Sequence, residues 1–173
     1  MSSHTVDIDD LKVSNRWKRR FKVFDLMQGD RLGRFGYMAT NEYNELGWRD
    51  RYGINYNLWA FFFGFIYYVL KGMPYKACMI LSLTLLWTQL LTVIDHTGSF
   101  KVPEMLYWFI PAFFCAMLAN LDYYRKVVHE EKMWRIWPKF FHRAAGVILL
   151  LISVLIIVSV IEITLIQPLL IRE

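Results

Sequence analysis

The chain has 173 residues, of which 56% are hydrophobic and 17% aromatic, and a formal net charge of +5. A soluble domain of this length cannot hide so much apolar surface, and the apolar residues come in long blocks, as in helices in lipid. The two cysteines, Cys78 and Cys115, lie inside these blocks. We expect them to be small buried hydrophobes and not part of a disulfide framework. The composition therefore predicts an all-α integral membrane protein.

The first expected element is a basic amphipathic helix over about residues 14–27, within a cytoplasmic amino-terminal region covering residues 1–56. Ser14 is a possible N-cap, and Gly29 follows as a stop signal. Such a helix either lies among the headgroups of an anionic leaflet or packs on the rest of the protein, and both alternatives stay open. The candidate contacts with a membrane surface or a partner are Trp17, Lys18, Arg19, Arg20 and Phe21.

Four apolar segments make up an expected transmembrane domain over residues 57–173. They cover residues 57–70, 75–94, 105–121 and 144–166. The first is shorter than the roughly 20 residues that a full crossing needs, and Lys71, Gly72 and Pro74 interrupt the chain after it. The other three are long enough to span. Residues 122–143 form a basic loop.

The distribution of charge favours three spans over four. If all four segments crossed the membrane from a cytoplasmic amino terminus, the basic loop 122–143 would lie outside, against the positive-inside tendency. If segment 57–70 is instead a short or re-entrant helix, the basic regions all lie inside and the carboxyl terminus lies outside. We therefore predict a small helical bundle of three full spans plus one short or re-entrant helix, with the amino terminus in the cytoplasm.

Several stretches resemble a known family. One is Asn57-Leu-Trp-Ala-Phe-Phe-Phe63-Gly64, which is followed by Tyr67-Tyr68 and by Lys71-Gly72-Met73. Others are Asn120 with Tyr123 and Tyr124, and Trp17-Lys-Arg-Arg-Phe21. Together they resemble the bacterial membrane-protein family known as domain of unknown function 2628. Phe65 and Pro74 depart from its usual pattern, and the long segment 144–166 exceeds its minimal module. The resemblance implies a small, multi-pass protein of the bacterial inner membrane. It implies no activity and brings no catalytic residues.

Signatures of enzymes are absent from the sequence: there is no Gly-x-Ser-x-Gly elbow, no His-Glu-x-x-His and no Walker loop. His129-Glu130-Glu131 has the residue types of an acid–base or metal cluster, but a solvated charged helix is the simpler interpretation. We expect no catalytic, cofactor-binding or metal-binding residues. No nucleic-acid partner is expected, because the aromatic residues gather at segment ends as in an interfacial belt.

Four polar residues inside apolar segments are candidates for function: Glu162, Asn120, Gln89 and Thr88. An acid in an apolar run is a functional candidate by default, although Glu162 is also close enough to its helix end to reach water. Thr88 and Gln89 belong to a polar stripe, and packing against a neighbouring helix is the usual role of such groups.

Two hypotheses about function follow, with a third much weaker one. The first is a non-catalytic protein that works by contact with a membrane or membrane-active protein, as an adaptor, an assembly factor or an immunity-type protein. The alternative is an oligomeric transport or channel element that uses Glu162 and the polar helix faces; a short helix supports it, because such helices recur at transport sites. The third is a membrane enzyme using His129, Glu130 or Asp95.

Overall fold

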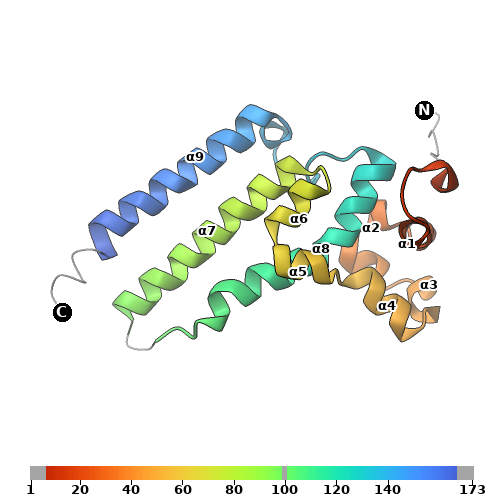
Figure 1. Ribbon diagram of the computed structural model, residues 1–173, viewed down its shortest axis with the longest axis horizontal. Coiled ribbons are helices and arrows are strands. Elements are labelled where there is room, and N and C mark those ends of the chain that lie inside the picture. Colours follow the sequence, from red (N-terminus) through yellow and green to blue (C-terminus); the bar gives the residue numbers. More distant parts are fainter. Residues whose placement is uncertain (1–6, 99–100, 167–173) are drawn as a thin grey trace. The chain divides into compact units, whose positions relative to one another are not determined.

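The computed structural model describes residues 7–98 and 101–166, with side chains up to Thr164 (Figure 1). Every regular element within these ranges is a helix, which confirms the all-α prediction. The chain divides into two compact units. Unit 1 combines Met1–Asn57 with Ala116–Glu131, and unit 2 combines Leu58–Cys115 with Lys132–Glu173.

Unit 1 gathers short helices around the second part of a long one. Its elements are η1 (Ile8–Asp10), α1 (Asn15–Leu26), α2 (Gly29–Tyr37), α3 (Asn41–Glu45), α4 (Trp48–Asn55) and the carboxyl-terminal part of α8 (Met105–His129). The amphipathic helix α1 thus forms as expected, from Ser14 to a left-handed Gln28 (φ 52°). The region after α1 holds three helices, and Gly33 kinks the first of them with a φ of 69°. Local side-chain capping contributes here, since Thr40 Oγ1 accepts a hydrogen bond from Tyr43 N.

The core of unit 1 is mainly aromatic. Phe21 and Phe24 of α1, Tyr37 of α2 and Tyr124 of α8 have no exposed surface. Their rings meet at centroid separations of 5.3–5.7 Å, for example Phe24 with Tyr124 and with Tyr37. Aromatic pairs at such separations are favourable beyond the area they bury. The apolar face of α1 is therefore used inside the protein.

Unit 2 holds the most apolar helices. They are α5 (Leu58–Phe63), α6 (Phe65–Leu70), α7 (Pro74–Thr97), the first part of α8 and α9 (Ala144–Ile161), which continues into the π-helical turn η3 (Glu162–Ile166). The prediction of one short helix over residues 57–70 is wrong in one respect, because the segment forms two helices, α5 and α6. It is broken at Gly64, whose φ of 51° and ψ of −127° suit glycine alone.

Helices α7 and α9 pack side by side and run in the same direction (Figure 1). Met79 of α7 and Val147 of α9 meet near the start of both helices, together with Met133 from the connecting segment. Gly146 lets α9 begin close to the preceding turn, because a Cβ there would collide with the backbone oxygen of Phe140. Two parallel helices must be joined by a return passage, and in the chain order α8 lies between them.

Three helices among the described residues are long and apolar enough to cross a membrane: Pro74–Thr97, Met105–His129 and Ala144–Thr164. They correspond to the three expected spans, and the chain is a multi-pass membrane protein by this criterion. The second continues beyond the expected end at Leu121 as far as His129, so the first part of the expected loop 122–143 is helical. Glu130, with a φ of 53°, ends the helix, which therefore does not extend toward Trp137.

Candidate functional site

The polar residues of the family-like stretches form a buried network in unit 1. Asn57 and Asn120 are both buried, and Asn57 Nδ2 donates to Asn120 Oδ1 at 2.8 Å. Asn120 Nδ2 donates to the carbonyl oxygens of Gly53, Ile54 and Tyr56 at 3.0–3.1 Å. The candidate residue Asn120 thus satisfies backbone carbonyls in the last turn of α4 and at the residue after it, which is a packing role.

A second group of buried polar residues, Arg34, Tyr37 and Asn55, was not identified from the sequence. The Tyr37 hydroxyl donates to Asn55 Oδ1 at 2.9 Å, and Arg34 Nη1 donates to the carbonyls of Asn55 and Met117. Burial raises the pKa of Tyr37 to about 12, against the opposing charge of Arg34. These residues lie on short helices without clear periodicity, so no sequence pattern separates them from surface residues.

Tyr124, another residue of the family-like stretches, joins α8 to α1. Its ring is buried, and its hydroxyl donates to Asp25 Oδ1 at 3.1 Å. His129 Nε2 lies 3.2 Å from the same hydroxyl. Next to it, Arg125 Nη2 donates to the carbonyls of Gly29 and Asp30. This end of α8 is therefore fastened to the α1–α2 turn by side chains.

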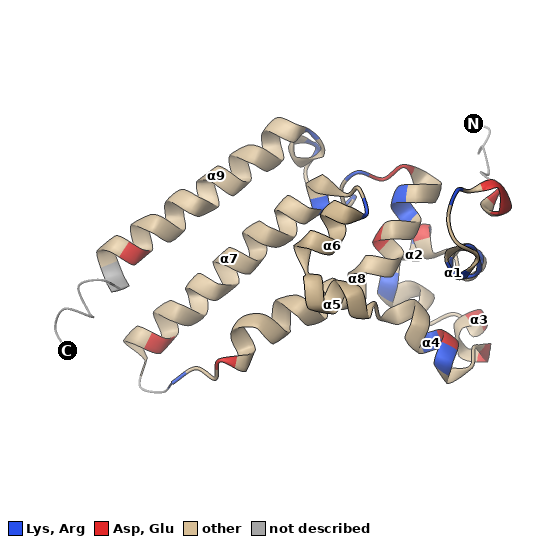
Figure 2. Ribbon diagram, viewed as in Figure 1, with Lys and Arg blue, Asp and Glu red and all other residues tan. Residues whose placement is uncertain are grey.

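The predicted contact residues of α1 fall on different sides of the helix. Phe21 is fully buried, and Trp17 packs edge-on against Tyr123 with ring centroids 4.7 Å apart. Both rings thus contact other aromatic rings of unit 1. Figure 2 shows the cations of α1, and of these Arg19 is 74% exposed at its side chain.

The cations on α1 are neutralised unevenly. Lys22 Nζ binds Asp9 Oδ2 at 2.7 Å, and Lys18 Nζ donates to the Asp9 carbonyl at 2.5 Å. The hydrogen bond from Lys22 lowers the pKa of Asp9 below its ordinary value. Arg19 Nη2 binds both carboxylate oxygens of Asp50, at 3.0 and 3.1 Å. Arg20 lies over the Trp17 ring, 5.0 Å from its centroid.

In unit 2 the family-like residues build two turns. Gly64 breaks the chain after Phe63, which is stacked on Trp59 and half exposed. The buried rings of Tyr67 and Tyr68 follow on α6. Lys71 lies 5.9 Å from the Tyr67 ring centroid. Gly72, with a φ of 69°, then lets Met73 N donate to the Tyr68 carbonyl at 2.8 Å before α7 begins. The motif thus specifies a break and a tight turn.

The polar candidates on α7 lie within its packed surface. Gln89 is buried, and its Nε2 has no hydrogen-bond partner among the described residues; the same holds for Ser82 Oγ, seven positions earlier on the same helix face. Thr88 contributes its carbonyl to the Thr92 hydroxyl at 2.9 Å. Buried polar atoms without partners are uncommon in native proteins. The contacts of Thr88 account for its position, whereas no hydrogen bond among the described residues accounts for the burial of Gln89 Nε2 and Ser82 Oγ.

Glu162 lies at the junction of α9 and η3 and is exposed. In the part of the chain that the structure describes, no hydrogen bond joins it to Thr88 or Gln89. The prediction that these three residues form one functional group stays a prediction.

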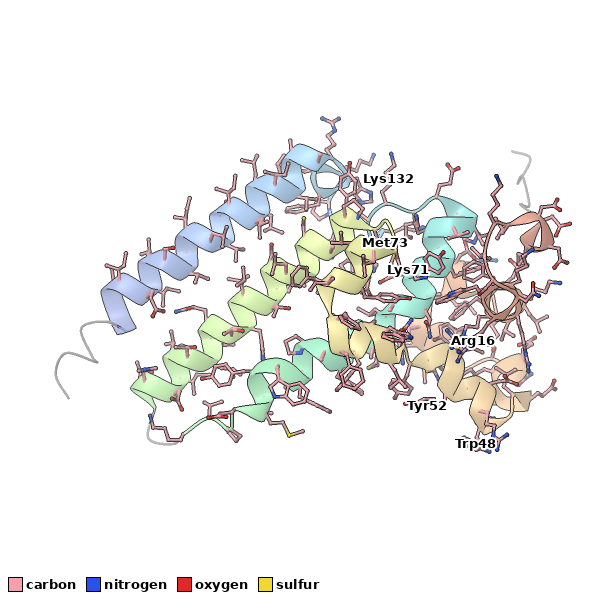
Figure 3. The ribbon with its side chains drawn as sticks, viewed as in Figure 1. Arg16, Trp48, Tyr52, Lys71, Met73 and Lys132 are labelled. Carbon is pink, nitrogen blue, oxygen red and sulfur yellow. The ribbon has the colours of Figure 1, made fainter. Side chains whose placement is uncertain are left out.

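The two ends of unit 2 differ in charge (Figure 2). The end at which α7 and α9 begin carries Lys71, Lys132, Lys139 and Arg143, which we call the basic end; Figure 3 labels its first two residues. Lys76, also at this end, is buried with its Nζ 5.5 Å from the Trp134 ring centroid. At the far ends of α7 and α9 stand the acids Asp95 and Glu162. Asp95 closes the turn there by accepting from Val102 N at 2.7 Å.

Within residues 7–98 and 101–166, no three His, Cys, Asp or Glu side chains are grouped so as to hold a metal ion. A family model described as "Protein of unknown function (DUF2628)" matches residues 13–129, which include both polar networks of unit 1 and the turns around Gly64 and Gly72. No curated protein and no solved structure matches the chain.

Proposed function

We propose that this chain, which belongs to the DUF2628 family of proteins of unknown function, acts by contact with another membrane protein and catalyses no reaction. The observation that carries the proposal is that the polar side chains of the family motif are engaged inside the protein. Asn57, Asn120 and Tyr124 are hydrogen-bonded within the chain. The exposed surface of unit 2 includes apolar side chains of α9 and the cations Lys132, Lys139 and Arg143. Surfaces of this kind bind partners and do not activate substrates.

The proposal includes a location and an orientation. We place the protein in the bacterial inner membrane with its amino terminus and the basic end in the cytoplasm. The support is the charge difference between the two ends of unit 2, because Lys and Arg accumulate on the cytoplasmic side of spanning helices. Parallel α7 and α9 agree with this orientation, since both then begin at the cytoplasmic face.

The test is site-specific photo-cross-linking in living cells. A photoreactive amino acid replaces Lys132 at the basic end or Ile156 on α9, which is 59% exposed. The matched control replaces Val154, which is on the same helix but 2% exposed. We expect a discrete adduct with a foreign protein from Lys132 or Ile156 and none from Val154. Mass spectrometry of the adduct then identifies the partner.

Two results would contradict the proposal. One is an adduct only with a second copy of this chain, and the other is labelling of lipid alone at both exposed positions. The first of these favours the alternative function, an oligomeric transport or channel element.

The alternative rests on the unpartnered polar atoms of Gln89 and Ser82 together with the acid Glu162. Polar groups inside membrane helices often mark the route of an ion or solute. Under this alternative Glu162→Gln abolishes flux in reconstituted vesicles, whereas under the contact function it leaves cross-linking to the partner unchanged. Ser159→Ala is a suitable control, because the Ser159 hydroxyl only donates to the Leu155 carbonyl of its own helix.

A further inference from the structure

A small pocket between α1 and α4 in unit 1 concentrates positive charge. Its cationic lining is Arg16, Arg19 and Arg20 of α1 with Arg49 of α4, and its one acid is Asp50. The cavity measures about 160 Å³, below the roughly 300–1,000 Å³ of sites for organic ligands of drug size. A ligand that fills it is therefore small or inserts only a small group.

The charges in this pocket do not balance. Asp50 is bound on both of its oxygens by Arg19, so this carboxylate is already occupied. Among the described residues, Arg16 and Arg49 have no carboxylate partner, and Arg49 lies over the Trp48 ring at 5.3 Å. On the neighbouring surface of α1, by contrast, Asp9 engages both lysines. Clustered like charges repel one another, and an anion that enters relieves this repulsion.

We infer that this pocket binds a phosphate group, held by the guanidinium groups of Arg16 and Arg49. Guanidinium groups present paired N–H donors in a plane that matches the oxygens of phosphate. Two of them beside one small cavity can share the oxygens of a single phosphate. This inference does not depend on the proposed contact with a partner protein.

The phosphate group can come from an anionic lipid or from solution, and the surroundings favour the lipid. Trp48 and Tyr52, labelled in Figure 3, lie four positions apart on α4 and are 74% and 50% exposed, and Arg49 follows Trp48 in the sequence. Exposed Trp and Tyr residues next to cations are typical of protein surfaces at the level of lipid headgroups.

The experiment uses the full chain, purified in an uncharged maltoside detergent without phosphate. Two probes are titrated: inorganic phosphate by calorimetry, and phosphatidylglycerol by native mass spectrometry, with phosphatidylcholine as the zwitterionic comparison. Arg16→Gln/Arg49→Gln is expected to weaken binding by roughly tenfold or more, because it removes two charge-assisted contacts. Lys12→Gln/Arg31→Gln, which removes the same charge from exposed positions outside the pocket, is expected to change it less than twofold.

Asp50→Asn provides a test in the opposite direction. It releases Arg19 and removes the competing carboxylate, so binding is expected to strengthen several-fold. Circular dichroism and elution volume establish that each variant is folded. Equal weakening by the two double variants, or no binding of either probe by the unaltered protein, overturns the inference.

The source of the phosphate group is read from the same titrations. A lipid site binds phosphatidylglycerol more tightly than inorganic phosphate, and Trp48→Ser/Tyr52→Ser weakens only the lipid. A site for free phosphate binds inorganic phosphate at least as tightly, and the aromatic variant changes neither probe. Both outcomes support the pocket, provided that Arg16→Gln/Arg49→Gln weakens the probe that binds.

Discussion

At the scale of single residues, Asn120 shows how a side chain can substitute for regular backbone pairing. One amide group serves three carbonyls around the end of α4 and accepts from Asn57. Asn120→Ala is expected to destabilise the protein by about 3 kcal/mol, since several buried groups lose their partner. For a chain of this size that lowers Tm by about 6–12 °C, measured by thermal unfolding in detergent.

A graded variant separates lost hydrogen bonds from a lost side chain. Asn120→Asp keeps an acceptor for Asn57 but offers no N–H to the three carbonyls. It is therefore expected to be destabilising too, and the three carbonyls, not Asn57, dominate the effect. A Tm for Asn120→Ala within about 2 °C of the unaltered protein would mean that the network carries little of the stability.

Gln89 leads to the opposite expectation. Because its Nε2 is buried without a partner, Gln89→Met, of similar volume, is expected to raise the stability by about 1 kcal/mol. The measurement is the thermal midpoint, with Thr88→Val on the same helix as the comparison. A loss of stability in Gln89→Met would show that the amide is satisfied in the membrane, and it would strengthen the transport alternative.

Tyr37 predicts how unit 1 responds to alkaline pH. Its pKa is raised to about 12 by burial, compared with about 10 for an unfolded tyrosine. The neutral hydroxyl therefore adds stability that is fully present below pH 10 and is lost as the pH rises toward 12, on the order of 2 kcal/mol. Denaturant unfolding at pH 9 and pH 11.5 should show a smaller pH effect in Tyr37→Phe. An unchanged pH effect would contradict this assignment.

At the scale of elements, Gly64 decides whether residues 58–70 form one helix or two. Its positive φ with ψ of −127° is accessible to glycine and costs other residues about 1–3 kcal/mol. Gly64→Ala is thus expected to lower Tm by about 2–12 °C or to fuse α5 with α6. Gly53→Ala is the control, because this helical position of α4 has room for a methyl group and meets only Arg20 at 3.7 Å.

Helix α1 contributes both to the core of unit 1 and to its surface, so deleting the helix is a poor test of whether its exposed cations bind a partner. Phe21 and Phe24 fill the core of unit 1, so a deletion of residues 1–27 would expose that core as well as remove the cations. Loss of partner binding after such a deletion would not distinguish contact from misfolding. Substitution of exposed charges such as Arg16 avoids this difficulty.

At the scale of the whole molecule, the orientation of the spans depends on charge. In the orientation that we propose, the carboxyl terminus lies outside; neutralising the cations between α8 and α9 is expected to weaken this bias and to give a mixed population. The variant carries Lys132→Gln, Arg135→Gln, Lys139→Gln and Arg143→Gln. A reporter enzyme that is active only outside the cytoplasm, fused to the carboxyl terminus, measures the fraction. Asp95→Asn/Glu104→Gln is expected to change little, because acids contribute weakly to orientation.

The sequence by itself determined the helical class, the three long apolar helices and the amphipathic character of α1. These properties follow from the composition and the periodicity of a short stretch of sequence. They therefore depend on residues that are neighbours along the chain. The resemblance carried by Asn57, Gly64 and Tyr124 likewise led to the family, because a motif is a property of the chain alone.

Only the tertiary structure decided which side of α1 is available and what Asn120 does. Whether Phe21 meets lipid or protein depends on Tyr124, a residue distant in sequence, and no local pattern contains that information. The arginine pocket has the same origin: Arg16 and Arg49 become neighbours only when α1 and α4 pack. The sequence determines which side chains are present, but long-range packing determines which of them are grouped into a site.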